Sequence, residues 1–192
     1  MSAATAKRTA PSRKEATHEK IVVAAARAIR RSGYGGTGVA DIMKDVGLTH
    51  GGFYAHFASR EAMLAEAADQ AGAESVATLT RVAAAVPPTE ALRSLIEAYL
   101  SKEHVEDAET GCPVAALGSE MPRQAPKVRR AATRRIKEVI DLVTQYSLDR
   151  DEALTTVATM VGALVLARAV DDPKLSKALR EASVKYFDST GA

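Results

Sequence analysis

The chain has 192 residues, of which 46% are hydrophobic and 26% charged, enough for one or two small domains with a substantial core. Residues 1–60 hold 10 Lys/Arg against 4 Asp/Glu, a charge of +6, whereas the remaining residues hold 16 against 20, a charge of −4. A basic N-terminal part on a mildly acidic body is expected if that part alone meets nucleic acid. The one cysteine, Cys112, excludes an intramolecular disulfide and suits a reducing compartment.

The first part of the chain combines a basic arm with the start of a long helix. Residues 1–11 are predicted to be a disordered arm that could touch DNA or do nothing. They contain no apolar run of the kind a signal peptide needs, so a cytoplasmic protein is expected. Ser12 and Glu15 have the spacing of a capping box, and the helix that they open is predicted to end at the glycine-rich residues 33–38. Its apolar stripe consists of Ile21, Val22, Ala25, Ala28 and Ile29.

Two short predicted helices follow, joined by a glycine turn. The first is an amphipathic segment that stops at Gly47, and the second begins after Thr49, whose side chain is suited to cap it. Two brief helices joined in this way are the pattern of a helix-turn-helix, whose second helix enters the DNA major groove. The exposed amide groups of that helix's first turn would point at a phosphate. DNA binding is therefore the leading hypothesis.

The second of these helices carries side chains suited to such a contact. His50, Gly51 and Gly52 stand where a recognition helix usually meets base edges. Each glycine costs about 1 kcal/mol against alanine in a helix, a cost that is easier to understand if backbone must approach DNA closely. Tyr54 and His56 offer donors to phosphates, and the two phenylalanines of the segment are expected to anchor it in a small core. The alternative is an ordinary helical turn with core aromatics.

Residues 47–57, followed by residues 59–64, resemble the DNA-binding domain of the TetR family of bacterial transcriptional regulators. The resemblance covers about residues 15–65, and the remainder is similar only in being helical and of suitable length. It implies two sets of DNA contacts: phosphate contacts by Thr37, Tyr54, His56 and Arg60, and base contacts by His50, Gly51 and Gly52.

The chain departs from the family pattern around the first of the two short helices. Gly38 stands where a serine or threonine often caps that helix, which weakens its start, although Asp41 still favours a helix N-terminus. Met43 and Val46 replace the usual small alanines. We expect these larger side chains to change the packing more than the role of the helix.

The rest of the chain is predicted to be helical almost throughout, because β-branched alternation never persists. The predicted order is a helix over residues 59–87, a helix over 89–100, an acidic loop or frayed helix over 101–111, and helices over 113–121, 126–147, 150–170 and 173–187. His104, in the acidic stretch, is interpreted as a residue of a solvated loop rather than a metal ligand. The fold class is therefore all-α, with a three-helix helix-turn-helix domain over residues 12–58 and a helical-bundle domain for effector binding and dimerisation over residues 59–192.

The helix predicted to start at residue 150 bears on assembly. It is apolar on nearly every face from Ala153 to Ala167, which is too short for a membrane span of roughly 20 residues and too apolar for one neighbouring surface to cover. A two-fold dimer would cover it and supply two recognition helices for half-sites about 34 Å or more apart. The alternative is a helix buried entirely within its own domain. Predicted interface residues are Leu154, Val161, Gly162, Val165, Leu175, Leu179 and Ala182.

Cys112 is a candidate sensor. It precedes Pro113 and so could cap the next helix, where the positive helix end would acidify its thiol. A subset of TetR-like regulators has a cysteine in a similar Gly-Cys setting, and some of these regulators sense electrophiles or oxidants. The simpler interpretation of Cys112 is a small buried hydrophobic residue. Candidate effector or redox residues, chosen for position and chemistry, are Tyr99, Cys112, Met121, Tyr146 and Met160.

These features predict a cytoplasmic homodimeric regulator that is responsive to a ligand or to redox state. By family precedent it is a repressor that binds a palindromic double-stranded DNA operator and is released by a small-molecule effector. No cofactor or metal is expected, and no nucleophile elbow, metal-ligand motif or acid/base pair supports catalysis. The alternative function is a low-specificity DNA-binding scaffold or nucleoid-associated protein without an effector.

Overall fold

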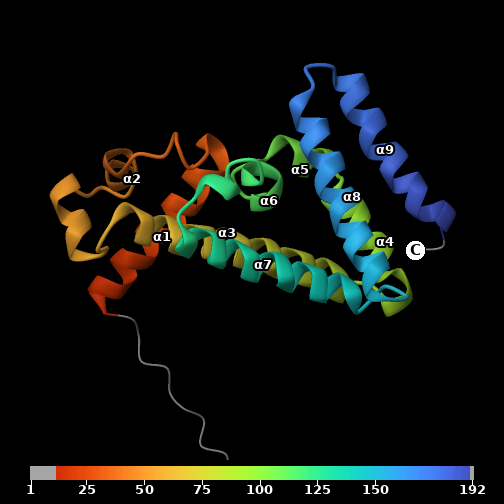
Figure 1. Ribbon diagram of the computed structural model, residues 1–192, viewed down its shortest axis with the longest axis horizontal. Helices are drawn as coiled ribbons and strands as arrows, with labels where there is room; N and C mark the ends of the chain where they lie inside the picture. The colour runs from red at the N-terminus through yellow and green to blue at the C-terminus, as the bar shows by residue number, and fades with distance from the viewer. Residues whose placement is uncertain (1–11, 191–192) are drawn as a thin grey trace, which may run out of the picture.

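The computed structural model describes residues 12–190, and all regular structure in that range is helical. The predicted arm over residues 1–11 lies outside the described residues. The elements shown in Figure 1 are α1 Arg13–Ser32, α2 Val39–Asp45, the 3₁₀ helix η1 His50–Ala55, α3 Arg60–Ala84, α4 Pro88–Tyr99, α5 Lys102–Glu106, α6 Pro113–Leu117, the 3₁₀ helix η2 Met121–Arg123, α7 Pro126–Thr144, α8 Arg150–Ala169 and α9 Pro173–Thr190. The predicted all-α fold class is confirmed.

The ends of the helices have local causes that the sequence already contains. Ser12 and Glu15 form the predicted capping box, since the Ser12 hydroxyl accepts from the Glu15 amide at 3.2 Å and the Glu15 carboxylate accepts from the Ser12 amide at 2.7 Å. At the other end of α1, Gly33 adopts φ 73°, a conformation that favours glycine. Ser59 caps α3 by accepting from the Ala62 amide at 3.1 Å. Helix α2, as predicted, begins at Gly38 without a side-chain cap.

Helix α3 is the spine of the molecule. Its 25 residues run from the helix-turn-helix into the body, with α1 against its first half and α7 along its length (Figure 1). The close approach of α3 and α7 depends on Gly72, because a Cβ there would overlap the Arg135 side chain. Arg135 also donates to both carboxylate oxygens of Asp69, at 2.7 and 2.9 Å, which fixes the register of the two helices.

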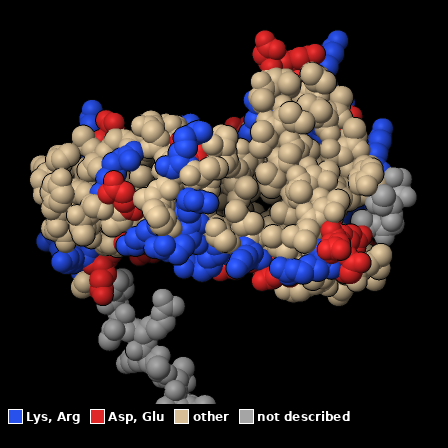
Figure 2. Space-filling model, in the orientation of Figure 1, with Lys and Arg blue, Asp and Glu red and all other residues tan. Residues whose placement is uncertain are grey.

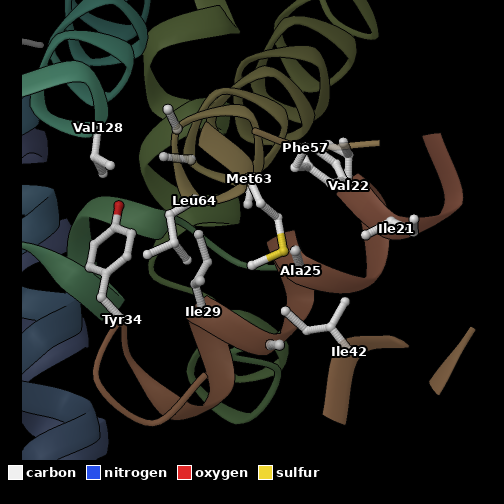
Figure 3. Packing of buried hydrophobic residues seen from close by; sticks show 14 of the residues in the cluster. Ile21, Val22, Ala25, Ile29, Tyr34, Ile42, Phe57, Met63, Leu64 and Val128 are labelled. Carbon is white, nitrogen blue, oxygen red and sulfur yellow. The ribbon is translucent and has the colours of Figure 1, made fainter. Parts of the chain in front are cut away.

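Two hydrophobic clusters follow one another along this spine. We call the first the head core; it surrounds α1 and contains Ile29 and Phe57 (Figure 3). Phe53 belongs to the same cluster. Leu117 and Val128, from the second half of the chain, are fully buried in it. The second cluster, the body core, lies between α3, α4, α7, α8 and α9. The head core therefore includes residues beyond the predicted domain boundary at residue 58. That boundary remains a prediction about where the DNA-binding function ends.

Helices α8 and α9 form a layer at one end of the body (Figure 1). Within the described residues, α8 is the one helix long and apolar enough to cross a membrane. It packs on α6, α7 and α9, with a third of its apolar window buried inside the protomer. Length and composition of this kind also occur in core helices of soluble proteins, which are mostly buried, whereas α8 leaves part of its apolar surface exposed in the protomer.

Candidate nucleic-acid interface and effector cavity

The helix-turn-helix is formed by α2, a turn at Gly47 and η1. Gly47 adopts φ 74°, and the Leu48 amide beyond it donates back to the Met43 carbonyl at 2.8 Å, which reverses the chain sharply. The recognition segment that follows is a 3₁₀ helix. Thr49 occupies its N-cap position, but the predicted side-chain cap is wrong. The tight turn instead uses the Thr49 carbonyl, which accepts from the Gly52 amide at 3.0 Å.

Two aromatic rings anchor η1, as predicted. Phe53 and Phe57 are buried and stack with ring centroids 5.4 Å apart. The ring of His18 in α1 stacks on Phe57 at 4.5 Å, and its Nε2 lies 2.6 Å from a Glu66 carboxylate oxygen. His18 could not be predicted from the sequence, because a single polar residue on a helix carries no signal for a distant aromatic partner. With this side of η1 buried, the opposite side faces outward.

The outward side of η1 carries the residues predicted to meet DNA. Tyr54 is 70% exposed, and His50 is exposed beside it with ring centroids 6.5 Å apart in an edge-on arrangement. Thr49 and Gly51 are also exposed. An exposed large aromatic residue next to an imidazole is unusual for a surface that only meets water, and it suits contacts with phosphates and bases.

The two glycines of η1 are not required by the chain's own packing. A Cβ at Gly51 would meet nothing within 4 Å, and a Cβ at Gly52 would make ordinary contacts with Met43 at 3.6 Å and Thr49 at 3.9 Å. Within the described residues, the only glycines with positive φ are Gly33 and Gly47. Neither strain nor crowding inside the protomer therefore explains why glycine occupies these positions. A partner that approaches from outside would.

Thr37 and Arg60 lie at the base of the head rather than on its outward side. Thr37 is buried, and its hydroxyl donates to the Gly33 carbonyl at 2.7 Å. The Arg60 guanidinium donates to the Thr37 carbonyl at 3.0 Å and to the Tyr34 carbonyl. Both side chains hold the loop between α1 and α2, so the phosphate contacts that the resemblance implies for them remain predictions.

His56 occupies an intermediate position. It is half-buried, its ring lies 6.1 Å from the His18 ring, and its Nδ1 atom is buried without a hydrogen-bond partner. An unsatisfied imidazole nitrogen at the edge of a surface is suited to a ligand or partner that reaches it. The structure therefore places His56 beside the exposed residues of η1, although less accessible than Tyr54.

A second feature of the molecule is a pair of neighbouring cavities in the body. An open cleft of about 620 Å³ lies between α1, α3, α4 and α5, with Arg27 of α1 among its lining residues. Behind it is an enclosed chamber of about 30 Å³, lined by aliphatic side chains of α3, α6, α7 and α8. The cleft lies in the size range of ligand sites.

The dividing wall, as we call the residues that line both cavities, consists of Ser75, Leu79, Tyr99 and Cys112. Tyr99 and Cys112 were predicted effector candidates, and Met160, a third, lines the chamber. The other two candidates line neither cavity. Met121 packs against the head core and its sulfur accepts from the Tyr34 hydroxyl at 3.7 Å, while Tyr146 lies half-buried at the far end of α7.

His104 supports this wall, and its interpretation as a residue of a solvated loop is wrong. It lies in α5, where its Nδ1 donates to the Tyr99 carbonyl at 2.6 Å and its Nε2 accepts from the Cys112 amide at 2.9 Å. Burial lowers the pKa of His104, so the ring is neutral and both nitrogens have partners. Arg168 of α8 fixes the same segment by donating to the Val105 carbonyl at 3.2 Å.

Tyr99 and Cys112 meet at this wall. Cys112 is buried and occupies the N-cap of α6, as predicted, with Pro113 at the first helical position. The Tyr99 side chain is 2% exposed, and its hydroxyl has no hydrogen-bond partner. Burial, with a smaller effect of the nearby Cys112 thiol, raises the pKa of Tyr99 well above its usual value, so the phenol keeps its proton. The thiol is close enough to the hydroxyl to raise its pKa, but the pair does not meet hydrogen-bond geometry.

The exposed face of α8 and α9 contains most of the predicted interface residues. Leu154, Val165 and Leu175 are 41%, 39% and 46% exposed, and Gly162 opens onto empty space. Ala182 is exposed and Leu179 half-buried on the same pair of helices. Val161 differs, because it is half-buried and lines the apolar chamber. Exposed leucines and valines on adjacent helices form an apolar surface of the kind that marks a protein interface.

Lysine and arginine side chains of α7 gather along one edge of the molecule (Figure 2). Arg134 and Arg135 are paired with Asp69, at 2.5 and 2.7 Å. Val128 and Ala132 on the opposite side of the helix are buried. The helix thus has the amphipathic arrangement of a solvated basic face.

The geometry is that of a helical DNA-binding regulator with a helix-turn-helix at one end. Comparison with known proteins gives the family. Residues 21–67 match the bacterial regulatory proteins of the tetR family, and residues 88–184 match the C-terminal domain of LmrA/YxaF-like transcriptional regulators. The chain belongs to the TetR family and is a transcriptional regulator with a helix-turn-helix DNA-binding domain.

Relatives and solved structures agree. The chain is 32% identical over 169 residues to an uncharacterised HTH-type transcriptional regulator of Mycobacterium tuberculosis, covering 80% of this chain and 85% of the relative. It resembles a TetR transcriptional regulator from Chloroflexus aurantiacus, with a TM-score of 0.76 and 26% identity over 91% of this chain and 96% of the other. A TetR-family regulator from Cytophaga hutchinsonii has a TM-score of 0.79 at 20% identity, covering 94% and 98%, which shows the shared fold.

Proposed function

We propose that this protein is a cytoplasmic homodimeric repressor that binds a palindromic operator and is released by a small-molecule effector. The observation that carries the DNA-binding part is the outward side of η1. There Tyr54 and His50 are exposed, and Gly51 and Gly52 leave room that the protomer itself does not need. Backbone close to base edges, flanked by phosphate donors, is an arrangement for reading a duplex in the major groove.

The apolar face of α8 and α9 supports the dimer. Leu154, Val165 and Leu175 are large hydrophobic residues left exposed on adjacent helices, and Gly162 between them allows close helix approach. A two-fold axis through this face packs it against the same face of a second protomer and places both heads on the same side of the dimer. Two copies of η1 then read two half-sites, which makes the preferred site a palindrome.

The position of the cleft supports release by an effector. One wall of the cleft includes Arg27 of α1, so a bound molecule would touch the head directly. Cys112, in the dividing wall, is the N-cap residue of α6. Just beyond the other end of α6, the Glu120 carboxylate accepts a hydrogen bond from the Tyr34 amide at 2.9 Å. A shift of α6 therefore moves the loop between α1 and α2. An effector that binds more tightly to one arrangement of the body shifts the population of spacings between the two heads. Coupling of this kind typically changes affinity by about 5-fold to 150-fold.

Selection from a random duplex pool with the purified protein tests this function. A palindrome enriched at moderate salt is expected, because a dimer with two recognition segments reads symmetric half-sites. No enriched site, with binding that disappears as salt rises, would favour the low-specificity scaffold instead. A small-molecule effector should then lower affinity for the enriched duplex and raise thermal stability.

A second candidate for the signal is chemical modification of Cys112. The observation that favours it is the surroundings of the thiol, which lines the open cleft beside the unpartnered Tyr99 hydroxyl. Arg168, whose Nη1 is buried without a partner, is close enough for its pKa to depend on Cys112. Alkylation of the sulfur would add bulk to the dividing wall and move α6.

We expect a thiol-alkylating reagent to release the wild-type protein from the enriched duplex and to leave Cys112→Ser bound. An equal response of both proteins would eliminate the thiol as the signal.

A further inference from the structure

The dividing wall places a polar group between an open cavity and an apolar one. On the inner side, Val139, Val157 and Met160 contribute to a chamber of about 30 Å³, which has room for little more than one water molecule. On the outer side, the cleft of about 620 Å³ is lined by both cations and carboxylates, among them Arg81 and Glu103. A molecule seated at the wall would therefore have an apolar surface on one side and a polar opening on the other.

The Tyr99 hydroxyl is the unsatisfied group of this wall. It is buried, has no hydrogen-bond partner, and belongs to a side chain that is 98% shielded from solvent. Buried phenols almost always find a partner, because an unmade hydrogen bond costs the full desolvation of the group. A buried hydroxyl without a partner in the protomer is suited to a ligand atom that accepts its hydrogen bond.

The surroundings of Tyr99 prevent the ring from turning away to satisfy itself. His104 packs edge-on against it, with centroids 4.7 Å apart and planes at 89°. The same imidazole accepts the Cys112 amide and donates to the Tyr99 carbonyl, so backbone and ring are held together. The hydroxyl is thus fixed in place at the boundary between the two cavities.

The protonation state of Tyr99 decides which ligand atom suits it. The phenol keeps its proton, so it has an O–H to donate. Arg168 lines neither cavity, so the phenol is the donor that a ligand seated at the wall would meet. An unsatisfied O–H donor at the boundary of the two cavities favours a ligand atom that accepts a hydrogen bond.

We propose that the effector is an apolar molecule with a carbonyl group, whose oxygen accepts the hydrogen bond of Tyr99 while its hydrocarbon part widens the chamber behind the wall. This inference rests on the proposed function in taking the cleft as the effector site. The binding step itself is independent of DNA release. Widening the chamber displaces Cys112 and hence the start of α6, which connects ligand binding to the head.

Matched pairs of ligands test the inference on the full-length protein without DNA. Each pair is a methyl ketone and the hydrocarbon in which a methylene group replaces the carbonyl, for example 2-acetylnaphthalene and 2-ethylnaphthalene, with further pairs on phenyl and n-octyl frames. Calorimetry and thermal shift measure both members. On at least one frame the ketone should bind roughly threefold to tenfold more tightly, the contribution of one hydrogen bond.

Two variants locate the hydrogen bond. Tyr99→Phe should remove the preference for the ketone and leave hydrocarbon affinity unchanged, since only the hydroxyl is lost. Tyr146→Phe is the matched control, because this tyrosine lines neither cavity, and it should keep the preference. The inference is overturned if no frame shows a ketone preference, or if the preference survives in Tyr99→Phe.

Release from DNA is measured separately, by anisotropy on the enriched duplex. Ketones that bind through Tyr99 but leave the duplex bound would support this inference and contradict release by an effector in the cleft. Selection of a palindrome together with no ketone preference would do the reverse, because it supports the regulator and removes the carbonyl as the recognised group.

Discussion

Replacing the two glycines of η1 by alanine separates the needs of the fold from the needs of DNA. At Gly51 the added methyl enters open space, and at Gly52 it makes ordinary contacts. Neither position requires a positive φ. Alanine lowers the backbone freedom of the unfolded chain, so each variant should unfold at the same free energy as the wild type or be more stable by about 0.5–1 kcal/mol.

DNA affinity should change in the opposite direction. A methyl group between the recognition segment and the base edges forces the backbone outward, which lengthens several hydrogen bonds at once. We expect at least a tenfold loss of affinity for the enriched duplex, equivalent to about 1.4 kcal/mol. Fluorescence anisotropy at fixed salt measures the affinity, and thermal unfolding measures the stability.

Gly35→Ala is the matched control. Gly35 also has open space around its Cβ position and no positive φ, but it lies in the loop before α2, outside η1. It should bind DNA like the wild type. If Gly51→Ala and Gly52→Ala bound the duplex as tightly as this control, the close approach of backbone to DNA would be refuted.

Three further predictions concern the other surfaces. Tyr54→Phe should weaken DNA binding roughly threefold to tenfold and evenly across sequences, as loss of a phosphate contact does. His50→Ala should instead change which duplex is preferred. Equal sequence preferences for the two variants would contradict this division of roles. Gly162→Trp should convert the proposed dimer into a monomer in sedimentation analysis, because the indole blocks close approach of α8 to its copy. A variant that is still dimeric would remove this face from the interface. Because burial lowers the pKa of His104, the unfolded chain binds its proton more readily, and the free energy of unfolding should fall as pH drops below about 6.5. His104→Gln should reduce that slope in thermal unfolding across pH 5–7, and an identical slope would mean that His104 does not cause it.

Much of the helical framework could be predicted from the sequence, because its signals are local. Three of these signals each act within one or two turns: the capping box at Ser12, the proline at the start of α6 and the helical spacing of apolar residues along α1. The buried phenylalanines and exposed tyrosine of η1 follow from the same short-range periodicity. The 3₁₀ geometry of η1 does not, since it depends on whether the chain closes its turn through the Thr49 carbonyl or the Thr49 side chain.

The candidate effector cavity could be predicted only in part, because the residues of the dividing wall come from distant segments. Tyr99 and Cys112 were recognisable as polar or reactive residues in helical surroundings. The role of His104 was not recognisable, because it depends on hydrogen bonds with Tyr99 and Cys112 that only the fold brings into reach. The packing of Met121 could not be predicted for the complementary reason. Its sequence position suggests the body, but the segment after α6 folds back onto the head core.

The affinity ratio between the enriched palindrome and a shuffled duplex, measured at physiological salt, tests the central claim most directly. A sequence-specific dimeric regulator should prefer the palindrome by roughly 10³ or more, with two protomers bound to each duplex. A ratio near one, with both affinities falling steeply together as salt rises, would contradict the account and leave a chain that binds DNA only through its charge.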